Sequence, residues 1–295
     1  MKAVILAAGE GRRLRPITNY VPKPMIPFFG KPFLEYTIQN LVGVVDGVVL
    51  IVKYKQEQLR DYFGDCYASL PIEYVEQQEL QGTAAALITA KNFVGEKFFV
   101  LQGDVYAPRS ILLEMKEINA EHVLSLTKVN DPENHAGIDY NGDGRVKKTF
   151  TSGPWVDRGV WFFSSVIFDY IENIQMFCKE LRVLIAVQQM IDDGINVFSY
   201  TSIEPWVQLG DHAPLDSVLN ALDFFLKRNG GNVATYQSDS EIKRSSVEVE
   251  VIGSKIYNSL IFGYGMVIDS LIENSIIYCS KIIRDKTIIN KILVE

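Results

Sequence analysis

Apolar runs alternate with segments of helical spacing along the first 130 residues. Strands are predicted at residues 2–8, 47–52, 72–75, 97–101 and 122–129. The runs at 2–8 and 47–52 are continuous and rich in Val, Ile and Leu, which is typical of strands buried on both faces of a parallel sheet. Between the strands, apolar side chains recur at helical spacing at residues 33–42, 55–63 and 85–92. Strand alternating with helix predicts an α/β fold with a mostly parallel, Rossmann-like sheet.

The pattern changes after residue 231. A helix predicted at 215–227 ends at Gly230-Gly231, and beyond it single apolar residues recur every five or six positions among Ser, Asn, Gly and Asp. These positions are Ile256, Ile261, Val267, Ile272, Ile277, Ile283 and Ile288. The spacing resembles the hexapeptide repeat of a left-handed parallel β-helix of two to three coils. We therefore expect a domain at 1–231 and a short β-helix at 232–295, which serves as an oligomerisation module.

Composition and charge exclude several classes of partner. The chain has 295 residues and a net charge of −7, whereas proteins that bind nucleic acid or a membrane surface carry an excess of Lys and Arg. No apolar run reaches membrane-spanning length, and the chain begins directly with a core strand. Its three cysteines are widely separated and lack metal spacing, as in a reduced protein without zinc. The sequence therefore predicts a cytoplasmic protein with no nucleic-acid and no membrane partner.

The candidate chemistry lies in the first 35 residues. They read L-A-A-G-E-G-R-R-L-R-P-I-T from Leu6 to Thr18 and P-K-P-M-I-P from Pro22 to Pro27. Gly9 and Gly11 directly follow the first predicted strand, and glycine lets backbone N–H groups approach an anion. The nearby cations are Arg12, Arg13, Arg15 and Lys23, and such groups suit phosphate oxygens. This stretch predicts a polyphosphate site.

Two other glycine loops do not fit this stretch. A dinucleotide-binding G-x-G-x-x-G would need Gly or Ala where Leu14 stands, and Pro16 disfavours the long helix that should follow. A P-loop would need Ser or Thr after Gly30-Lys31, where the chain has Pro32.

The stretch resembles the opening of the sugar-1-phosphate nucleotidyltransferases, or NDP-sugar pyrophosphorylases. Their pattern is L-A-(A/G)-G-x-G-T-R-L-x-P-x-T, followed by P-K-P-(M/L)-x-P and G-(K/R)-P. The chain departs from it at Arg12, where the family usually has Thr. The resemblance extends to glucose-1-phosphate thymidylyltransferases and UDP-sugar pyrophosphorylases, and it implies the nucleotide-diphospho-sugar transferase fold.

The resemblance also implies roles for individual residues. Arg13 and Lys23 would be catalytic. Asp104, at the end of the strand predicted at 97–101, would bind Mg²⁺, the implied cofactor. The nucleotide would be bound by Leu6, Ala8, Gly9, Gly11, Gln77, Gly82 and Thr83. The amide of Gln77 offers a donor and an acceptor, which can pair with the imide edge of uracil or thymine. A solvated polar loop is the alternative reading of the Gln77 segment.

The second half of the motif set is altered. Gly137 matches the glycine that contacts the sugar, but the family's Glu-Lys pair that binds the sugar phosphate is replaced by Thr151-Ser152. Gln208 stands where the family has its second metal-binding Asp. Arg158 and Asp211 are the candidate substitutes, for the missing Lys and for the missing Asp.

The expected reaction is transfer of a nucleotidyl group from UTP or dTTP to a sugar 1-phosphate, giving NDP-sugar and pyrophosphate. The partners would be a nucleoside triphosphate, a sugar 1-phosphate and further copies of the chain in a homo-oligomer. The alternative is a nucleotide-binding paralogue with a degenerate sugar-phosphate site, acting as a regulatory or partner subunit.

Overall fold

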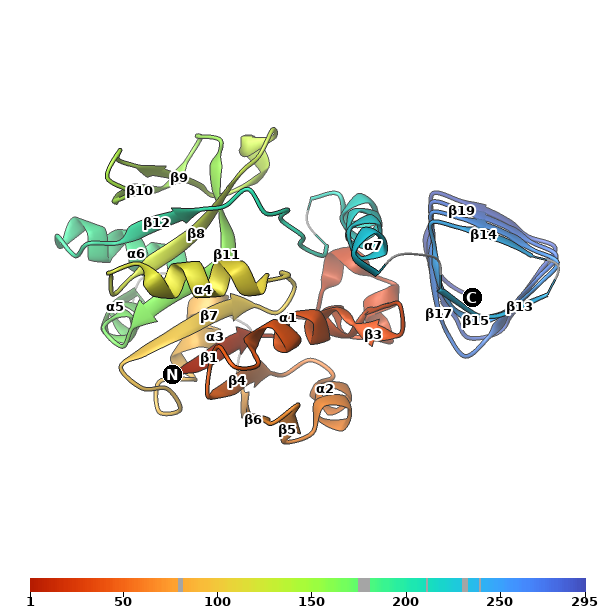
Figure 1. The fold of residues 1–295 in the computed structure, drawn as a ribbon, viewed down its shortest axis with the longest axis horizontal. Helices are drawn as coiled ribbons and strands as arrows, with labels where there is room; N and C mark the ends of the chain where they lie inside the picture. Colours follow the sequence, from red (N-terminus) through yellow and green to blue (C-terminus); the bar gives the residue numbers. More distant parts are fainter. Residues whose placement is uncertain (79–81, 175–180, 211, 230–232, 239) are drawn as a thin grey trace. The chain divides into compact units, whose positions relative to one another are not determined.

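A ten-stranded sheet is built from residues 2–201 in the computed structural model, which describes residues 1–295 except 79–81, 175–180, 211, 230–232 and 239 (Figure 1). Neighbouring parallel strands follow the order β7-β1-β4-β6. Their bounds are β1 (Lys2–Leu6), β4 (Gly47–Val52), β6 (Leu70–Glu76) and β7 (Lys97–Gln102). The strands predicted at 2–8, 47–52, 72–75 and 97–101 are confirmed.

The sheet becomes mixed on the other side of β7. The long strand β11 (Trp155–Ser164) runs antiparallel to β7 and to β8 (Val123–Lys128). The remaining strands are β5 (Cys66–Tyr67), β9 (Gly137–Tyr140), β10 (Val146–Thr151) and β12 (Phe198–Thr201). A 3-10 turn, η4 (Pro132–Asn134), precedes β9.

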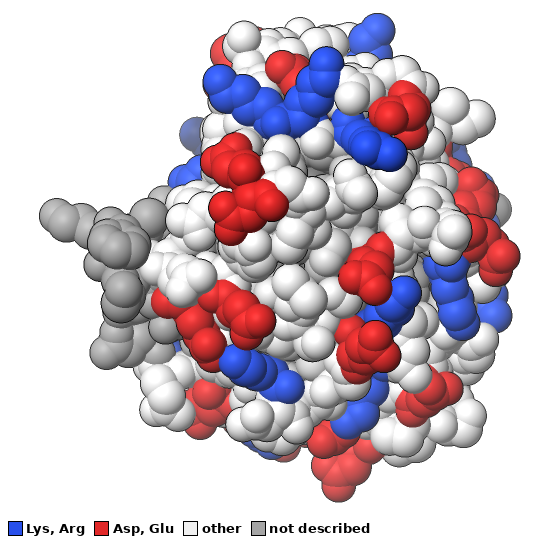
Figure 2. All heavy atoms as spheres, turned by 90° about the vertical axis from the view of Figure 1, so that its left-hand side faces the viewer, with Lys and Arg blue, Asp and Glu red and all other residues white. Residues whose placement is uncertain are grey.

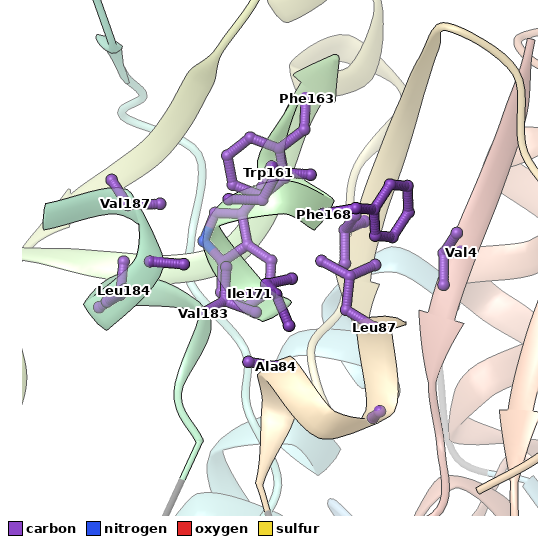
Figure 3. Packing of buried hydrophobic residues seen from close by; sticks show 14 of the residues in the cluster. Val4, Ala84, Leu87, Trp161, Phe163, Phe168, Ile171, Val183, Leu184 and Val187 are labelled. Atoms are coloured by element: carbon purple, nitrogen blue, oxygen red, sulfur yellow. The ribbon is translucent and has the colours of Figure 1, made fainter. Parts of the chain in front are cut away.

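Three helices pack against one face of the sheet around Trp161. They are α3 (Thr83–Ile88), α5 (Ile167–Ile174) and α6 (Val183–Asp192). Figure 3 shows Leu184 and Val187 of α6 beside Trp161, with Ala84 and Leu87 of α3 below. The other helices of this region lie outside that cluster: α1 (Phe33–Leu41), α2 (Gln56–Phe63) and α4 (Arg109–Glu117). Figure 1 shows α1 and α4 in front of the sheet.

The chain forms two compact units that divide it unevenly. The first contains Met1–Gly9 and Tyr36–Trp206, and the second contains Glu10–Glu35 and Val207–Glu295. The second unit begins with short 3-10 turns, η1 (Arg12–Leu14), η2 (Ile17–Asn19) and η3 (Lys23–Met25), and a hairpin of β2 (Pro27–Phe28) and β3 (Lys31–Pro32). Helix α7 (Pro214–Asn229) packs on this hairpin, where Phe28 lies 5.5 Å from Phe225 between ring centres.

The C-terminal strands form a parallel β-helix. They are β13 (Val233–Ser238), β14 (Glu241–Lys243), β15 (Ser246–Ile252), β16 (Lys255–Tyr257), β17 (Leu260–Gly263), β18 (Met266–Ile268), β19 (Leu271–Glu273), β20 (Ile276–Cys279), β21 (Ile282–Arg284), β22 (Thr287–Ile289) and β23 (Ile292–Val294). The apolar positions singled out from the repeat are all buried inside it. One of its sheets stacks four strands in successive coils, β14-β16-β19-β22, so the prediction of two to three coils was too low.

Serine ladders join successive coils of the β-helix. Ser270 N donates to Ser254 Oγ at 3.0 Å and Ser275 N donates to Ser259 Oγ at 3.1 Å, each across a step of 16 residues. A step of 16 is not a multiple of six, so the coil combines steps of five and six residues rather than three hexapeptides. Each buried hydroxyl also donates to a carbonyl two residues back, as Ser259 does to Tyr257 at 2.7 Å, so both of its polar functions are satisfied.

Acidic and basic side chains are interspersed on the face shown in Figure 2, in keeping with the modest net charge of −7. Within the described part of the chain, no helix is both long and apolar enough to cross a membrane.

Candidate functional site

The parallel strands of the first unit deliver the candidate residues to one edge of the sheet. Leu6, the last residue of β1, pairs with Ile51 of β4 on one side and with Gln102 of β7 on the other. The pairing continues past the strands, because Ala7 N donates to Ile51 O and Gly103 N to Leu6 O, both at 2.9 Å. Ligands of open α/β sheets bind beyond such carboxyl ends. The turn after β1 and the segment after β7 therefore lie side by side at this edge.

Two glycines at this edge have different surroundings: the backbone at Gly103 is closely packed, and the space beside Gly9 is open. A Cβ at Gly103 would lie 2.9 Å from Leu6 O, so only glycine allows the chain after β7 to follow the chain after β1 so closely. A Cβ at Gly9 would meet no atom within 4 Å, so the space beside its backbone is free for a ligand. The predicted anion cradle has the room that it needs on this side.

Asp104 follows Gly103 directly and is partly buried. Among the described residues, no group of three or more His, Cys, Asp and Glu is arranged to hold a metal ion. Mg²⁺ is commonly held by one or two carboxylates together with substrate phosphates and water, so a single Asp beside a phosphate cradle fits that ion.

Gln77 lies beyond the end of β6 and is almost fully buried, with 3% of its surface exposed. Its backbone N donates to Val52 O at 2.9 Å, which fixes it at the end of the neighbouring strand β4. Its side-chain Nε2 has no hydrogen-bond partner among the described residues. A buried donor without a partner costs about 1–3 kcal/mol, and a ligand that supplies an acceptor would remove this cost. The alternative of a solvated polar loop does not hold for the side chain of Gln77, which is buried, whereas its neighbours Glu76 and Gln78 are exposed.

Gly82 and Thr83 are fixed by the segment that leads into α6. Gly82 has φ +106°, and a Cβ there would lie 2.5 Å from Leu181 O. Ala84 N donates to Leu181 O at 2.7 Å, and Thr83 Oγ1 accepts from Val183 N at 3.1 Å. The Thr83 hydroxyl thus has a structural bond in addition to the nucleotide contact that we predict.

The second unit holds the other candidate residues in a run of 3-10 turns. Gly11 has φ +64°, a left-handed conformation that favours glycine. Thr18 Oγ1 donates to Gly11 O at 3.0 Å, and a Cβ at Gly11 would lie 3.2 Å from Lys23 Cβ, so the three residues pack together. Lys23 Nζ donates to Leu209 O at 3.1 Å. The loop is therefore closed on itself and tied to the chain before α7.

Glu10 is a member of this loop that the sequence pattern did not reveal. It accepts from Arg12 Nε at 2.8 Å and from Arg15 at 2.9 Å. The bond to Arg12 lowers the pKa of the Glu10 carboxyl. Arg12 and Arg15, two of the three arginines that we considered for phosphate, therefore share one carboxylate.

The sugar-phosphate candidates lie farther along the first unit. Gly137 stands opposite Thr151 in the β9–β10 pair, where a Cβ would lie 2.3 Å from Thr151 O, so the strand pairing itself requires glycine. Arg158 is buried at 1% exposure and donates to Glu204 O at 2.9 Å and to Pro205 O at 3.0 Å. Burial lowers its pKa to about 10.

The structure describes one of the two candidate substitutes, Arg158, and not the other, Asp211. Because two nitrogens of Arg158 are used by backbone carbonyls, the structure gives its guanidinium a structural task in place of a free phosphate-binding fork. Gln208 is partly buried, and Asp211 lies outside the described residues.

Comparison with known proteins shows the family of the chain. A family model for nucleotidyl transferases matches residues 2–226. The chain is 36% identical over 202 residues to the bifunctional protein GlmU of Methanococcus maripaludis, covering 66% of this chain and 48% of the relative. It is 31% identical over 213 residues to the D-glycero-alpha-D-manno-heptose 1-phosphate guanylyltransferase of Campylobacter jejuni, covering 66% of this chain and 95% of the relative. The chain spans about half the length of the GlmU relatives that it matches.

Solved structures share the fold. Apo UDP-glucose pyrophosphorylase superposes with a TM-score of 0.68 at 17% identity, over 77% of this chain and 98% of that chain. The inositol-1-phosphate CTP transferase of T. maritima gives a TM-score of 0.64 at 24% identity, over 75% and 93%. The strand-end motif, the fold and the matched residues 2–226 lead to one conclusion: the chain belongs to the nucleotidyl transferase family.

Proposed function

We propose that this chain transfers a nucleotidyl group from a nucleoside triphosphate to a sugar 1-phosphate. An oxygen of the sugar phosphate attacks the α-phosphorus of the triphosphate, the α–β bridging P–O bond breaks, and pyrophosphate leaves. The products are an NDP-sugar and pyrophosphate. No covalent intermediate with the protein is required, so the chain must position two anions and stabilise the charge on the leaving group.

The buried amide of Gln77 carries the proposal. Gln77 is almost fully buried, and its Nε2 lacks a hydrogen-bond partner among the described residues. A nucleobase carbonyl would supply the missing acceptor, and the Gln77 carbonyl could accept from the base in return. The open space beside Gly9 lies at the same sheet edge and leaves room for the phosphates.

Three charged side chains have complementary tasks in this proposal. Arg13 and Lys23 neutralise the triphosphate and the departing pyrophosphate. Asp104 would hold Mg²⁺, which when bound supplies positive charge to the phosphate oxygens. We further propose that Leu6, Ala8, Gly9, Gly11, Gly82 and Thr83 shape the nucleotide site and that Gly137 lines the sugar site.

The base and the sugar are narrower proposals. We propose UTP or dTTP, because a Gln amide matches the imide edge of uracil or thymine. The names of relatives and structural neighbours include a guanylyltransferase, a CTP transferase and UDP-glucose pyrophosphorylases, so the base varies among them. Gln77, rather than membership of the family, supports the pyrimidine.

Release of pyrophosphate tests the function directly. The purified chain is incubated with Mg²⁺, each of UTP, dTTP, CTP, ATP and GTP, and a panel of hexose 1-phosphates. We expect release with UTP or dTTP, and calorimetric titration should show these nucleotides binding more tightly than the purines. Gln77→Ala should remove the preference. A purine preference that is unchanged by Gln77→Ala would reject the role of Gln77.

A second candidate function is favoured by the sugar-phosphate half. Thr151 and Ser152 replace the Glu-Lys pair, and Arg158 donates to two carbonyls, which fits a nucleotide-binding paralogue that regulates a partner. Restoration separates the two. Gln208→Asp combined with Thr151→Glu and Ser152→Lys should give turnover to a degenerate paralogue, whereas a working enzyme should gain nothing. Nucleotide binding without wild-type turnover, followed by rescue, would overturn the enzymatic function in favour of the regulatory one.

A further inference from the structure

The β-helix contacts the loop that carries Arg13 and Lys23. Residues 11–27, which we call the signature loop, belong to the same compact unit as the β-helix. Tyr20, one residue past η2, stacks on Tyr278 of β20, with ring centres 4.9 Å apart and planes inclined by 20°. The turn η2 also lies against the last strand, β23. Stacked aromatic pairs stabilise a contact beyond the area that they bury.

The hairpin after the signature loop is held by a second set of contacts. Phe29 N donates to Ser246 Oγ at 2.9 Å, and Gly30 N donates to Glu248 Oε1 at 3.0 Å. Phe29 has φ +52°, which is strained for a bulky residue, so this turn needs outside support. Both acceptors lie on β15. The β-helix thus provides the partners for two backbone donors of the hairpin.

Glu248 supplies the acceptor of this contact from a partly buried position. It is half-buried, and burial raises the pKa of its carboxyl, so the charged form is disfavoured where it stands. Burial of a carboxylate costs free energy unless the group is hydrogen-bonded. The bond from Gly30 N to Glu248 Oε1 meets this need and links two segments that lie 218 residues apart in the sequence.

The β-helix therefore contacts the signature loop at Tyr20 and the hairpin that directly follows the loop at residues 29–30. Within the loop, Gly11, Thr18 and Lys23 pack together, as described above. Catalysis by charge requires the charges to be fixed in advance, and a misplacement of about 1 Å can cost ~100-fold in rate.

We infer that Tyr278 and Glu248 of the β-helix are positioning residues for the signature loop, so that the β-helix serves the nucleotide site of its own chain. The inference rests on the proposed function for its effect on turnover, whereas its effect on the loop does not. The sequence pattern alone gave the β-helix only the task of joining copies.

The first test uses the full chain and needs no substrate. Tyr278→Ala should speed amide hydrogen exchange in residues 12–25 by about fivefold, the factor that corresponds to a stacked pair of ~1 kcal/mol. Tyr278→Phe keeps the ring and should exchange like the wild type. Tyr257→Ala is the matched control, because the Tyr257 hydroxyl donates at 2.8 Å to Glu241 within the β-helix.

The second test uses Glu248. Glu248→Ala removes the acceptor of Gly30 N, whereas Glu248→Gln keeps a carbonyl oxygen and should rescue it. The rate is measured at triphosphate concentrations from below saturation up to saturation. Glu248→Ala and Tyr278→Ala should each lower kcat/KM for the triphosphate about fivefold. Their kcat/KM for the sugar phosphate at saturating nucleotide should change less, which a general loss of fold would not produce.

The outcomes separate the inference from the proposed function. Faster exchange in the alanine variants, with the wild-type rate in Tyr278→Phe and Glu248→Gln, supports the inference even if the wild type releases no pyrophosphate, and that result would reject only the proposed function. Exchange in residues 12–25 that is unchanged in both alanine variants would overturn the inference, whether or not the wild type is active.

Discussion

Burial of His122 makes the stability of the first unit depend on pH. The side chain is 1% exposed, its Nε2 lies 3.4 Å from Ser164 Oγ, and its Nδ1 has no partner among the described residues. Burial lowers its pKa from the ordinary 6.5 to about 4. The unfolded chain therefore binds a proton at a pH where the folded chain does not. The stability that His122 contributes is fully present above pH 6.5 and is lost as the pH falls toward 4.

We predict that His122→Phe weakens this loss. Between about pH 7 and pH 4.5 the wild type should lose on the order of 2–3 kcal/mol of unfolding free energy through His122, from the linkage of the shifted pKa. Urea unfolding of both proteins at both pH values gives the loss of unfolding free energy in each, and the two losses are then compared. An equal loss in the two proteins would remove His122 from this role.

Asp157 changes the stability with pH in the direction opposite to His122, and it is present in both the wild type and His122→Phe. It accepts from Trp161 Nε1 at 2.7 Å and from Gly159 N at 3.0 Å, and burial raises its pKa from 3.8 to about 6. The folded chain binds a proton first, so this group adds stability as the pH falls from 6 to 3.8. The wild-type loss should therefore be smaller than the His122 part alone, which is why the variant must be compared with it.

Individual residues were predictable where a strand end placed them. Asp104 and Gln77 stand two or three residues after the last residue of an apolar run, and parallel strands bring such positions to one edge of the sheet. Glu10 was not predictable, because its bonds to Arg12 and Arg15 form in an irregular loop that has no periodic pattern. Arg158 was misread because its partners Glu204 and Pro205 are more than forty residues away in the sequence.

At the scale of elements, Gly82 joins the loop before α3 to the start of α6. Its φ is +106°, and any Cβ at this position would lie 2.5 Å from Leu181 O, which leaves no room for a side chain. We predict that Gly82→Ala lowers the unfolding free energy by about 1–3 kcal/mol, through backbone strain and displacement of the 181–183 segment.

Gly95 offers the matched control for this substitution. A Cβ at Gly95 would meet nothing within 4 Å, so Gly95→Ala should stay within about 0.5 kcal/mol of the wild type. Urea denaturation of the three proteins at neutral pH measures the difference. Equal stabilities of the two variants would show that the loop relaxes freely around residue 82.

The elements themselves followed from the pattern wherever burial was two-sided. The predicted strand at 47–52 matches β4 residue for residue, because a strand buried on both faces reads as a continuous apolar run. The helix predicted at 85–92 is instead α3 at Thr83–Ile88, since Thr83 and Ala84 bond to the 181–183 segment and a distant contact decides where the helix begins. The β-helix was predictable from its buried apolar residues, and its 16-residue step is already present in their spacing, since Ile256 and Ile272, like Ile261 and Ile277, lie 16 residues apart.

At the scale of the whole molecule, we keep the prediction that the β-helix joins copies of the chain. Exposed apolar side chains remain on its outer face, and Ile282 of β21 is 60% exposed. Ile282→Asp should lower the mass measured by light scattering. Leu113→Asp, at a 42% exposed position on α4, is the control and should leave the mass unchanged. A wild-type mass of 33.3 kDa, that of one chain, would reject the oligomer.

The measurement closest to the proposed function is pyrophosphate release by the wild type and by two variants. Lys23→Ala and Asp104→Asn each remove one charge from the proposed nucleotide site, and each should lower the rate at least ~100-fold, the usual effect of losing one transition-state contact. Lys31→Ala is the control, because it also removes one positive charge but at a residue with no proposed contact with nucleotide. Lys31 Nζ instead lies 3.7 Å from Glu35 Oε1. We predict activity in the wild type and in Lys31→Ala, with loss in the other two. The proposed function is contradicted by a wild type that releases no pyrophosphate with any nucleotide and sugar 1-phosphate, or by Lys23 and Asp104 variants that remain fully active.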